Sequence, residues 1–322
     1  MIKKESVHCS HYDVVVESVR EVAHSVKEFV LKQIDGKEVF DCSAGSHITI
    51  DLPLPKKLHK NTYSIIRRTS DKRGYVIAVL KNENGRGGSK WMHENVKVGD
   101  AYKISTPGNM FSPKITSQYN ILFAGGIGIT PMISYIEWYE KYGGSWELHY
   151  ASRSPDNAAF YKDLKEKYGD RIQTYFESEG QRCDIEKILL NRSKGTNAYI
   201  CGPAGMIKAM QTIGESMGWP ETSLHSELFS AEGGEPFTVH LAKSKKSIHV
   251  GETQTMLEAI EDAGVEIPNV CRGGGCGYCK TKVLQGTPEH RDFYLTDHEK
   301  DENDYVMPCV SRCEGTEITI KV

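Results

Sequence analysis

The sequence predicts a multidomain protein of the β and α/β classes, in which an antiparallel barrel, a doubly wound parallel domain and a β-grasp domain follow one another. Three observations support this prediction. Short apolar strands separated by turns fill the first third of the chain, strands then alternate with helices, and a cysteine-rich loop lies near the end. At 322 residues the chain is long enough for two or three domains.

Composition narrows the class of protein. Hydrophobic content of 39% and charged content of 26% are typical of a soluble globular protein, and no apolar run approaches the ~20 residues of a membrane span. A net charge of -3 provides no basic face for nucleic acid. The chain starts with polar residues and not with an apolar signal core. Its nine cysteines, an odd number, fit a reducing compartment better than a set of disulfides. We therefore expect a cytoplasmic protein, monomeric when free, that binds neither nucleic acid nor membranes.

Residues 1–116 are predicted to form the barrel. Its expected strands are Val14–Val16, Val26–Leu31, Ile48–Leu52 and Tyr75–Leu80. Two polar motifs lie between and after these strands, Asn61–Ile65 and Asn84–Ser89, and the second leads into a helical stretch, Lys90–Glu94. A glycine-rich turn that opens a helix exposes unpaired N–H groups, which suits a phosphate. An ordinary turn between strands remains the alternative.

Residues 117–229 are predicted to form the parallel domain. The strand Tyr119–Ala124 runs into the glycine-rich loop Gly125–Pro131, and a helix follows to Tyr142. Four strands and three helices then alternate, namely strands 146–151, 171–177, 197–201 and 223–227 and helices 157–168, 184–190 and 204–217. Ligands bind such sheets at the carboxyl ends of the strands, so the loops 125–131 and 201–203 should face one crevice. A glycine turn that serves packing alone is the alternative.

Residues 230–235 are interpreted as a linker, and residues 236–322 as the β-grasp domain. Its expected elements are strands 237–241, 247–250, 280–284 and 317–322 and a helix, 255–263. This domain is the acidic part of the chain, with seven carboxylates between residues 289 and 304 against Arg291 and Lys300.

The cysteines of the last domain have the spacing of a plant-type 2Fe-2S site. Four residues separate Cys271 from Cys276, two separate Cys276 from Cys279, and Cys309 lies further along. Zinc sites usually combine two short Cys-x-x-Cys or Cys/His pairs, whereas this chain has one such pair, Cys276 and Cys279. A zinc site or buried thiols remain the alternatives, and Cys313 competes with Cys309 as the fourth ligand.

Together these three parts suggest an electron-transfer chain. Nicotinamide gives up two electrons as a hydride and an iron–sulfur cluster accepts one at a time, so a flavin is expected between them. The sequence resembles the phthalate dioxygenase reductase family along nearly its whole length and in the same domain order. Within the family it resembles the reductase components of carnitine monooxygenase and vanillate demethylase. The residues that carry this resemblance include Asn61-x-Tyr63-Ser64, His149-Tyr150-Ala151-x-Arg153-Ser154-Pro155 and Cys309-Val310-Ser311-Arg312.

The resemblance implies FMN, NADH and a 2Fe-2S cluster as cofactors. The residues implied for the flavin ring are Thr62, Tyr63 and Ser64, with Thr130 in contact and Phe229 packed against it, and those implied for its phosphate are Gly85, Arg86, Gly87, Gly88 and Ser89. Asn61 stands where many relatives have an arginine. The residues implied for the nicotinamide site are Gly126, Gly128, Pro131, Cys201, Gly202 and Pro203, and Ser152 and Arg153 lie where a 2′-phosphate would be read. Cys201 also has a simpler interpretation, as a small core residue at a strand end.

The implied function is that of an NADH-dependent reductase that feeds a separate Rieske-type oxygenase, with a carnitine or related quaternary amine monooxygenase as the candidate partner. Reduction of a haem monooxygenase or a free ferredoxin is the alternative enzyme role. A redox sensor whose nucleotide domain only binds its ligand is the alternative without catalysis. Flavin and dinucleotide sites in the same chain favour an enzyme.

Overall fold

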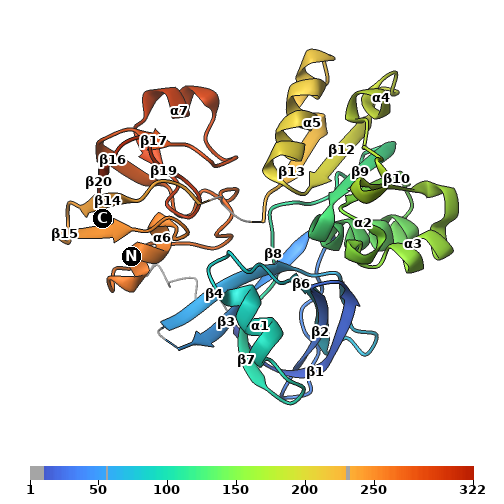
Figure 1. Ribbon diagram of the computed structural model, residues 1–322, viewed down its shortest axis with the longest axis horizontal. Coiled ribbons are helices and arrows are strands. Elements are labelled where there is room, and N and C mark those ends of the chain that lie inside the picture. The colour runs from blue at the N-terminus through green and yellow to red at the C-terminus, as the bar shows by residue number, and fades with distance from the viewer. Residues whose placement is uncertain (1–10, 56, 230–232) are drawn as a thin grey trace, which may run out of the picture. The chain divides into compact units, whose positions relative to one another are not determined.

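The computed structural model describes residues 11–55, 57–229 and 233–322 (Figure 1). Among these residues the chain divides into two compact units. Unit 1 comprises the chain up to Glu83 and the segment Gly87–Glu227. Unit 2 comprises the short segment Asn84–Arg86 and the chain from Leu228 to Val322. Residues 230–232 of the predicted linker lie outside the described residues. No helix in the described part of the chain has both the length and the apolar character that a membrane crossing requires.

The first half of unit 1 is a curled antiparallel sheet. The strand order is β4-β3-β7-β1-β2-β6-β5, and β8 pairs with β3. Alternate residues of β3 (Ile48, Ile50 and Leu52) are buried, because successive side chains of a strand point to opposite faces. The elements are β1 (His11–Ala23), β2 (Val26–Gln33), β3 (Ser46–Leu54), β4 (Lys57–Ser64), β5 (Arg67–Arg68), β6 (Gly74–Leu80), α1 (Gly88–Asn95), β7 (Ala101–Ser105) and β8 (Gly108–Asn109).

The sequence analysis expected no strands at β5, β7 and β8, and two further strands differ from the sequence-based expectation. β1 extends to Ala23, because it pairs with β2 across two register shifts that interrupt its apolar alternation. β4 was expected only as the polar motif 61–65, yet it pairs with β3 from Lys57 to Ser64. A lysine-rich strand at the end of a sheet has little apolar pattern from which to predict it.

The second half of unit 1 is a parallel sheet with strand order β11-β10-β9-β12-β13. The order reverses between β9 and β12, which places the topological switch point there. In Figure 1, α2 and α3 lie together and α4 lies beside α5. The strands are β9 (Tyr119–Gly125), β10 (Ser145–Ser152), β11 (Ile172–Phe176), β12 (Thr196–Cys201) and β13 (Leu224–Glu227), and the helices are α2 (Ile129–Tyr142), α3 (Tyr161–Tyr168), α4 (Ile185–Leu189) and α5 (Ala204–Ser216).

Helix α3 begins later than the predicted residue 157. Phe160, the residue before the helix, has a φ of 62°, in the left-handed region. A short 3-10 turn, Pro155–Asn157, precedes it. The chain therefore turns sharply between two helical segments that apolar periodicity cannot separate.

The two halves of unit 1 share an apolar core. The ring of Phe111 lies 5.4 Å from that of Tyr135 and 6.0 Å from that of Tyr199, centroid to centroid. The Tyr135 hydroxyl donates to the Phe111 carbonyl at 2.7 Å, and Gly45 N–H donates to Ser134 Oγ at 3.0 Å. A Cβ at Gly45 would lie 1.7 Å from the Phe111 carbonyl oxygen, so only glycine fits this junction.

Unit 2 has the mixed sheet of a β-grasp domain. Its strand order is β15-β14-β20-β16-β18, with β14 parallel to β20, and β17 pairs with β19. Thr255 caps α6 through the backbone N–H of Glu258, and Thr296 caps α7 in the same way through Glu299. The sequence analysis did not predict α7. The elements are β14 (Phe237–Leu241), β15 (Lys246–Val250), α6 (Met256–Asp262), β16 (Thr281–Gln285), β17 (Pro288–Glu289), α7 (Asp297–Glu302), β18 (Tyr305–Val306), β19 (Arg312–Cys313) and β20 (Glu317–Ile320).

The described part of the linker is fixed to unit 2. The guanidinium of Arg312, which is 3% exposed, donates to the carbonyls of Gly234 at 3.1 Å and Glu235 at 2.8 Å. It also donates to the carbonyls of Gly251 and Gln254. These bonds to a buried cation place residues 234 and 235 within unit 2.

Candidate functional site

The four predicted cluster ligands meet in two pairs. Cys279 Sγ lies 3.3 Å from Cys309 Sγ, and both residues are buried. The Cys276 thiol donates to the Cys271 sulfur, and chiefly for this reason the pKa of Cys271 is lowered to about 5. In a 2Fe-2S cluster each iron takes two protein ligands, so two pairs of thiols match the donor set that this group requires.

Backbone amides around Cys271 stabilise its thiolate. Gly273 N–H donates to Cys271 Sγ at 3.4 Å. The N–H groups of Gly275 and Cys276 also lower the pKa of this thiol, against the effect of burial. Gly274 has a φ of 77°, and a Cβ there would lie 2.7 Å from a methyl of Val310. The loop therefore surrounds the Cys271 sulfur with N–H donors, as an anionic cluster requires. The residues present fit a 2Fe-2S cluster.

A buried ion pair holds this loop, and sequence reasoning missed it. Arg272 has a φ of 51°, and its guanidinium donates to both carboxylate oxygens of Glu261, at 2.8 and 2.6 Å. Asn269 Oδ1 accepts a third bond at 3.1 Å. A bidentate pair of this kind offsets the strain of a non-glycine residue in the left-handed region. No local pattern links Arg272 to an acid on α6, so the sequence carried no signal for it.

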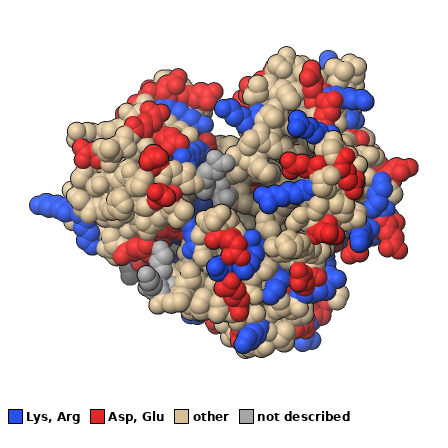
Figure 2. Space-filling model, viewed as in Figure 1, with Lys and Arg blue, Asp and Glu red and all other residues tan. Residues whose placement is uncertain are grey.

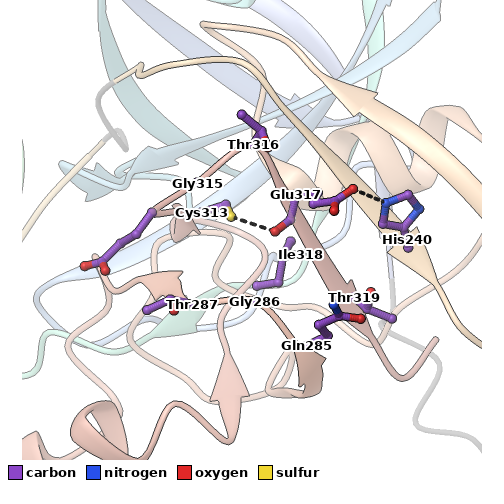
Figure 3. Close-up of a pocket in the computed structure, with 11 residues that line it drawn as sticks. His240, Gln285, Gly286, Thr287, Cys313, Gly315, Thr316, Glu317, Ile318 and Thr319 are labelled. Carbon is purple, nitrogen blue, oxygen red and sulfur yellow. Dashed lines mark hydrogen bonds and ion pairs between the residues drawn. The ribbon is translucent and has the colours of Figure 1, made fainter.

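Cys313 has a partner other than the four predicted ligands. Its thiol donates to the Glu317 carbonyl at 3.2 Å (Figure 3). It lines a polar cavity of about 450 Å³ that also contains His240 and Thr287 and none of the four paired cysteines. The placement of Cys309 beside Cys279 and of Cys313 beside Glu317 favours Cys309 as the fourth ligand.

At the switch point of the parallel sheet, the structure brings together the two loops predicted for the nicotinamide. Cys201 pairs in register with Ala124, so both loops start from the same edge. A Cβ at Gly125 would lie 2.5 Å from Pro203 Cδ, and a Cβ at Gly128 would lie 2.0 Å from the Cys201 carbonyl oxygen. Glycine is thus required for this close approach, while Gly126, with a φ of 54°, has open space where a side chain would be.

Three side chains predicted to act at this edge are buried. Burial, with a smaller effect from Glu227, raises the pKa of the fully buried Cys201 thiol. Cys201 therefore stays protonated, as expected for a core residue. Thr130 is 2% exposed and its hydroxyl donates to the Ile127 carbonyl at 3.1 Å, which stabilises the start of α2. Pro131 is also buried, in the first turn of that helix.

The residues predicted to read the nucleotide ribose lie at the same edge. Ser152 is the last residue of β10, and the exposed Arg153 follows it. Ala151 pairs with Gly125, so the end of β10 lies next to the glycine loop of β9. The Arg153 carbonyl accepts from Ser178 N–H at 2.8 Å, which fixes the backbone and leaves the side chain at the surface.

The polar residues predicted for the flavin lie on β4 and at the start of α1. Asn61 Nδ2 donates to the Tyr63 hydroxyl at 2.8 Å, so these two side chains share a face of β4 and Thr62 and Ser64 lie on the other. A Cβ at Gly88 would lie 2.5 Å from Asn61 Nδ2. The buried Asn61 Oδ1 has no hydrogen-bond partner among the described residues. This backbone cradle beside an unpaired amide oxygen suits a phosphate-bearing group with hydroxyls to donate.

The remaining predicted residues lie in different surroundings. Gly87 and Gly88 start α1, and Ser89 Oγ accepts from Asn82 N–H at 3.1 Å. Gly85 and Arg86 belong to unit 2, where Arg86 Nη1 donates to Glu258 Oε1 at 2.6 Å. Phe229 also belongs to unit 2 and is exposed. Within unit 2 the structure therefore brings the cluster thiols together, within unit 1 it brings the two nucleotide loops together, and the Arg86 guanidinium donates to a carboxylate.

Comparison with protein families assigns a model to each of the three parts. An oxidoreductase FAD-binding domain matches residues 13–112, an oxidoreductase NAD-binding domain matches residues 122–212, and a 2Fe-2S iron-sulfur cluster binding domain matches residues 239–314. The order of flavin, nicotinamide and iron–sulfur domains expected from the sequence is thereby confirmed.

Similar proteins cover nearly the whole chain. The heme-dependent oxidative N-demethylase beta subunit of Ectopseudomonas mendocina is 38% identical over 96% of this chain and 98% of its own length. A carnitine monooxygenase reductase subunit of Acinetobacter baumannii is 37% identical over 97% and 99%. The solved structure of phthalate dioxygenase reductase is 30% identical, covers 97% of this chain and 98% of its own, and superposes with a TM-score of 0.81.

Proposed function

Because the chain belongs to the phthalate dioxygenase reductase family, and is thus an oxidoreductase with flavin, NAD and 2Fe-2S domains, we propose that it is the reductase component of a two-component oxygenase system. Electrons enter from NADH in unit 1 and leave from unit 2 to a separate Rieske-type oxygenase. The observation that carries the proposal is the pairing of Cys271 with Cys276 and of Cys279 with Cys309, in a chain that also has a glycine-lined nucleotide edge.

A bound flavin supplies the conversion of one hydride into two single electrons. The residues of the chain bind and orient. Gly88 and Asn61 shape the cradle for the flavin phosphate, and the Gly125 and Gly202 backbones approach closely enough to leave a flat edge for the nicotinamide. The four thiols, with the amides around Cys271, hold the cluster. Cys201 forms no covalent bond in this proposal, because burial keeps its thiol protonated.

The partner's identity is the finer part of the proposal. Carnitine monooxygenase reductase subunits among the relatives support an oxygenase that acts on carnitine or a related quaternary amine. The similarity to the heme-dependent oxidative N-demethylase beta subunit favours a second candidate, a haem protein as acceptor. Reconstitution with a carnitine monooxygenase oxygenase component and with a haem-dependent demethylase separates the two. We propose further that the free reductase is a cytoplasmic monomer, which gel filtration and cell fractionation test.

Anaerobic reduction tests the central proposal. NADH added to the purified yellow-brown protein should bleach the flavin and cluster absorption, and admission of an electron acceptor should restore both. A protein that binds NADH without bleaching would instead act as the redox sensor.

We predict that heat releases FMN and not FAD, with one flavin per chain, because the family resemblance implies a phosphate anchor at Arg86 and Ser89 and the sequence offers no added adenine site. Arg86→Ala should weaken FMN binding about tenfold, since a charged hydrogen bond contributes about 1.5 to 3 kcal/mol and Arg86 must first leave Glu258. Flavin fluorescence titration of the apoprotein measures this change. Lys90→Ala, which removes an exposed cation of α1 that pairs with Glu83, is the matched control. Stoichiometric FAD in the extract would exclude the assignment.

We predict that NADH is preferred over NADPH, and kcat/KM for each, with ferricyanide as acceptor, measures the preference. Arg153 is the exposed cation at the end of β10, where a 2′-phosphate is read, so it sustains the residual use of NADPH. Arg153→Ala should lower kcat/KM for NADPH roughly tenfold, a typical charged-contact effect, and leave that for NADH nearly unchanged. A native enzyme that prefers NADPH would contradict this prediction.

A further inference from the structure

Three exposed aromatic side chains lie beside the second half of the cysteine loop. Tyr278, between two cluster ligands, is 64% exposed, and Phe293 and Tyr294 are 43% and 47% exposed. We call these three residues the aromatic face. Rings of this size usually bury much of their area, so several of them exposed together mark an interaction site and not ordinary surface.

The aromatic face is held rigidly against the cluster loop. Gly277 has a φ of 75°, and a Cβ there would lie 2.3 Å from Cζ of Tyr294, so the Tyr294 ring fills the place of a side chain between Cys276 and Cys279. Phe293 N–H donates to the Gly274 carbonyl at 3.2 Å.

The buried carboxylate of Asp292 fixes the segment that carries Phe293 and Tyr294. It accepts from Tyr294 N–H at 3.2 Å and from Leu295 N–H at 2.8 Å. These bonds give Phe293 and Tyr294 a fixed position, which lowers the entropy cost of docking.

Carboxylates surround this face on the side of α7. The exposed acids in and after that helix are Asp297, Asp301, Glu302 and Asp304, and Figure 2 shows acidic side chains gathered over this helix. Lys280, the cation near Tyr294, is paired with Glu299 at 2.7 Å. Lys300 on α7 offsets only part of the negative charge. The surroundings of the aromatic face are thus acidic, which complements a basic protein.

The first half of the cysteine loop is covered differently. A Cβ at Gly273 would lie 3.8 Å from the Leu228 carbonyl oxygen, so the chain entering unit 2 passes over that side. The second half, Cys276 to Cys279, has Tyr278 at the surface. Within unit 2 the aromatic face is therefore an exposed side of the loop, accessible to a partner.

We propose that the aromatic face is the docking surface at which the electron-acceptor protein of this reductase, through a basic surface of its own, binds and takes electrons from the cluster. The proposal rests on the proposed function of the chain as a reductase. In each encounter one electron would pass from the cluster to the oxidised iron centre of the acceptor protein, with no bond made or broken. The apolar rings exclude water at the contact, and the acidic residues of α7 set the orientation and speed of encounter.

Ferric cytochrome c, a strongly basic one-electron acceptor, is the probe for the test, used with the full-length holoprotein and NADH. Tyr278→Ala and Phe293→Ala should each lower kcat/KM for cytochrome c about fivefold or more, as truncation of an interface anchor does. Turnover with ferricyanide, which takes electrons from the flavin, and the visible spectrum of the cluster should not change. Tyr142→Ala is the matched control, because this tyrosine is 61% exposed on α2 in unit 1. Cytochrome c with acetylated lysines should be reduced more slowly, and its rate should lose its dependence on ionic strength.

The outcomes separate the two proposals. Unchanged cytochrome c kinetics in both variants would overturn the aromatic face and leave the reductase function standing. Reduction of cytochrome c that survives loss of the cluster in Cys309→Ser would overturn it as well, because the electrons would not leave from the cluster. Failure of the native protein to reduce ferricyanide with NADH would overturn the proposed function and this inference together.

Discussion

Replacing Cys309 with serine should abolish the 2Fe-2S cluster, whereas replacing Cys313 should leave it in place. Cys309 Sγ lies 3.3 Å from Cys279 Sγ in a buried position, and assembly requires both thiolates of this pair. The Cys313 thiol is engaged by the Glu317 carbonyl and lines a separate cavity. Visible absorption and iron content of the purified variants measure the result. We expect Cys309→Ser to lose the cluster bands and nearly all of its iron, and Cys313→Ser to match the native protein.

NADH-dependent reduction of ferricyanide is the internal control for both cysteine variants. It reports on unit 1, which contains none of the four ligands, so it should persist in both. Iron retained in Cys309→Ser and lost in Cys313→Ser would mean that the segment that carries Cys309 and Cys313 is threaded differently. Loss in both variants, with ferricyanide activity intact, would point to a misfolded unit 2, which thermal unfolding followed by far-UV circular dichroism would reveal.

Sequence reasoning succeeded where the chemistry depends on local spacing. The three cysteines of the loop are close neighbours along the chain, so their geometry is largely set by the backbone between them. The loops at Gly125 and Cys201 were predicted to share an edge, because parallel strands end on the same side of a sheet, and the register of Cys201 with Ala124 places them there.

The contacts that sequence reasoning missed join residues of different structural elements. The bidentate pair of Arg272 with Glu261, and the four carbonyls around Arg312, depend on how the elements pack and leave no periodic pattern. The signal for α7 was present, however, since Thr296 and Glu299 have the spacing of a capping box. For Arg86 the neighbouring glycines suggested a phosphate ligand. In the structure its guanidinium donates to Glu258, a partner that no local pattern around Arg86 indicates.

A fragment ending at residue 229 should still oxidise NADH with ferricyanide but should not reduce cytochrome c or an oxygenase. Unit 1 has its own apolar core, from the barrel strands through Phe111 and Tyr135 to the parallel sheet, so it should fold and unfold as one cooperative body. All four cluster thiols lie in the part removed. Steady-state rates with the two acceptors, measured on the same preparation, give the result: most of the ferricyanide rate kept and the protein-acceptor rate abolished.

Adding residues 233–322 as a separate cluster-loaded protein should restore cytochrome c reduction only in proportion to its concentration, because the covalent linkage that gives a high effective concentration is gone. Full turnover of an oxygenase by the fragment alone would refute electron transfer through unit 2.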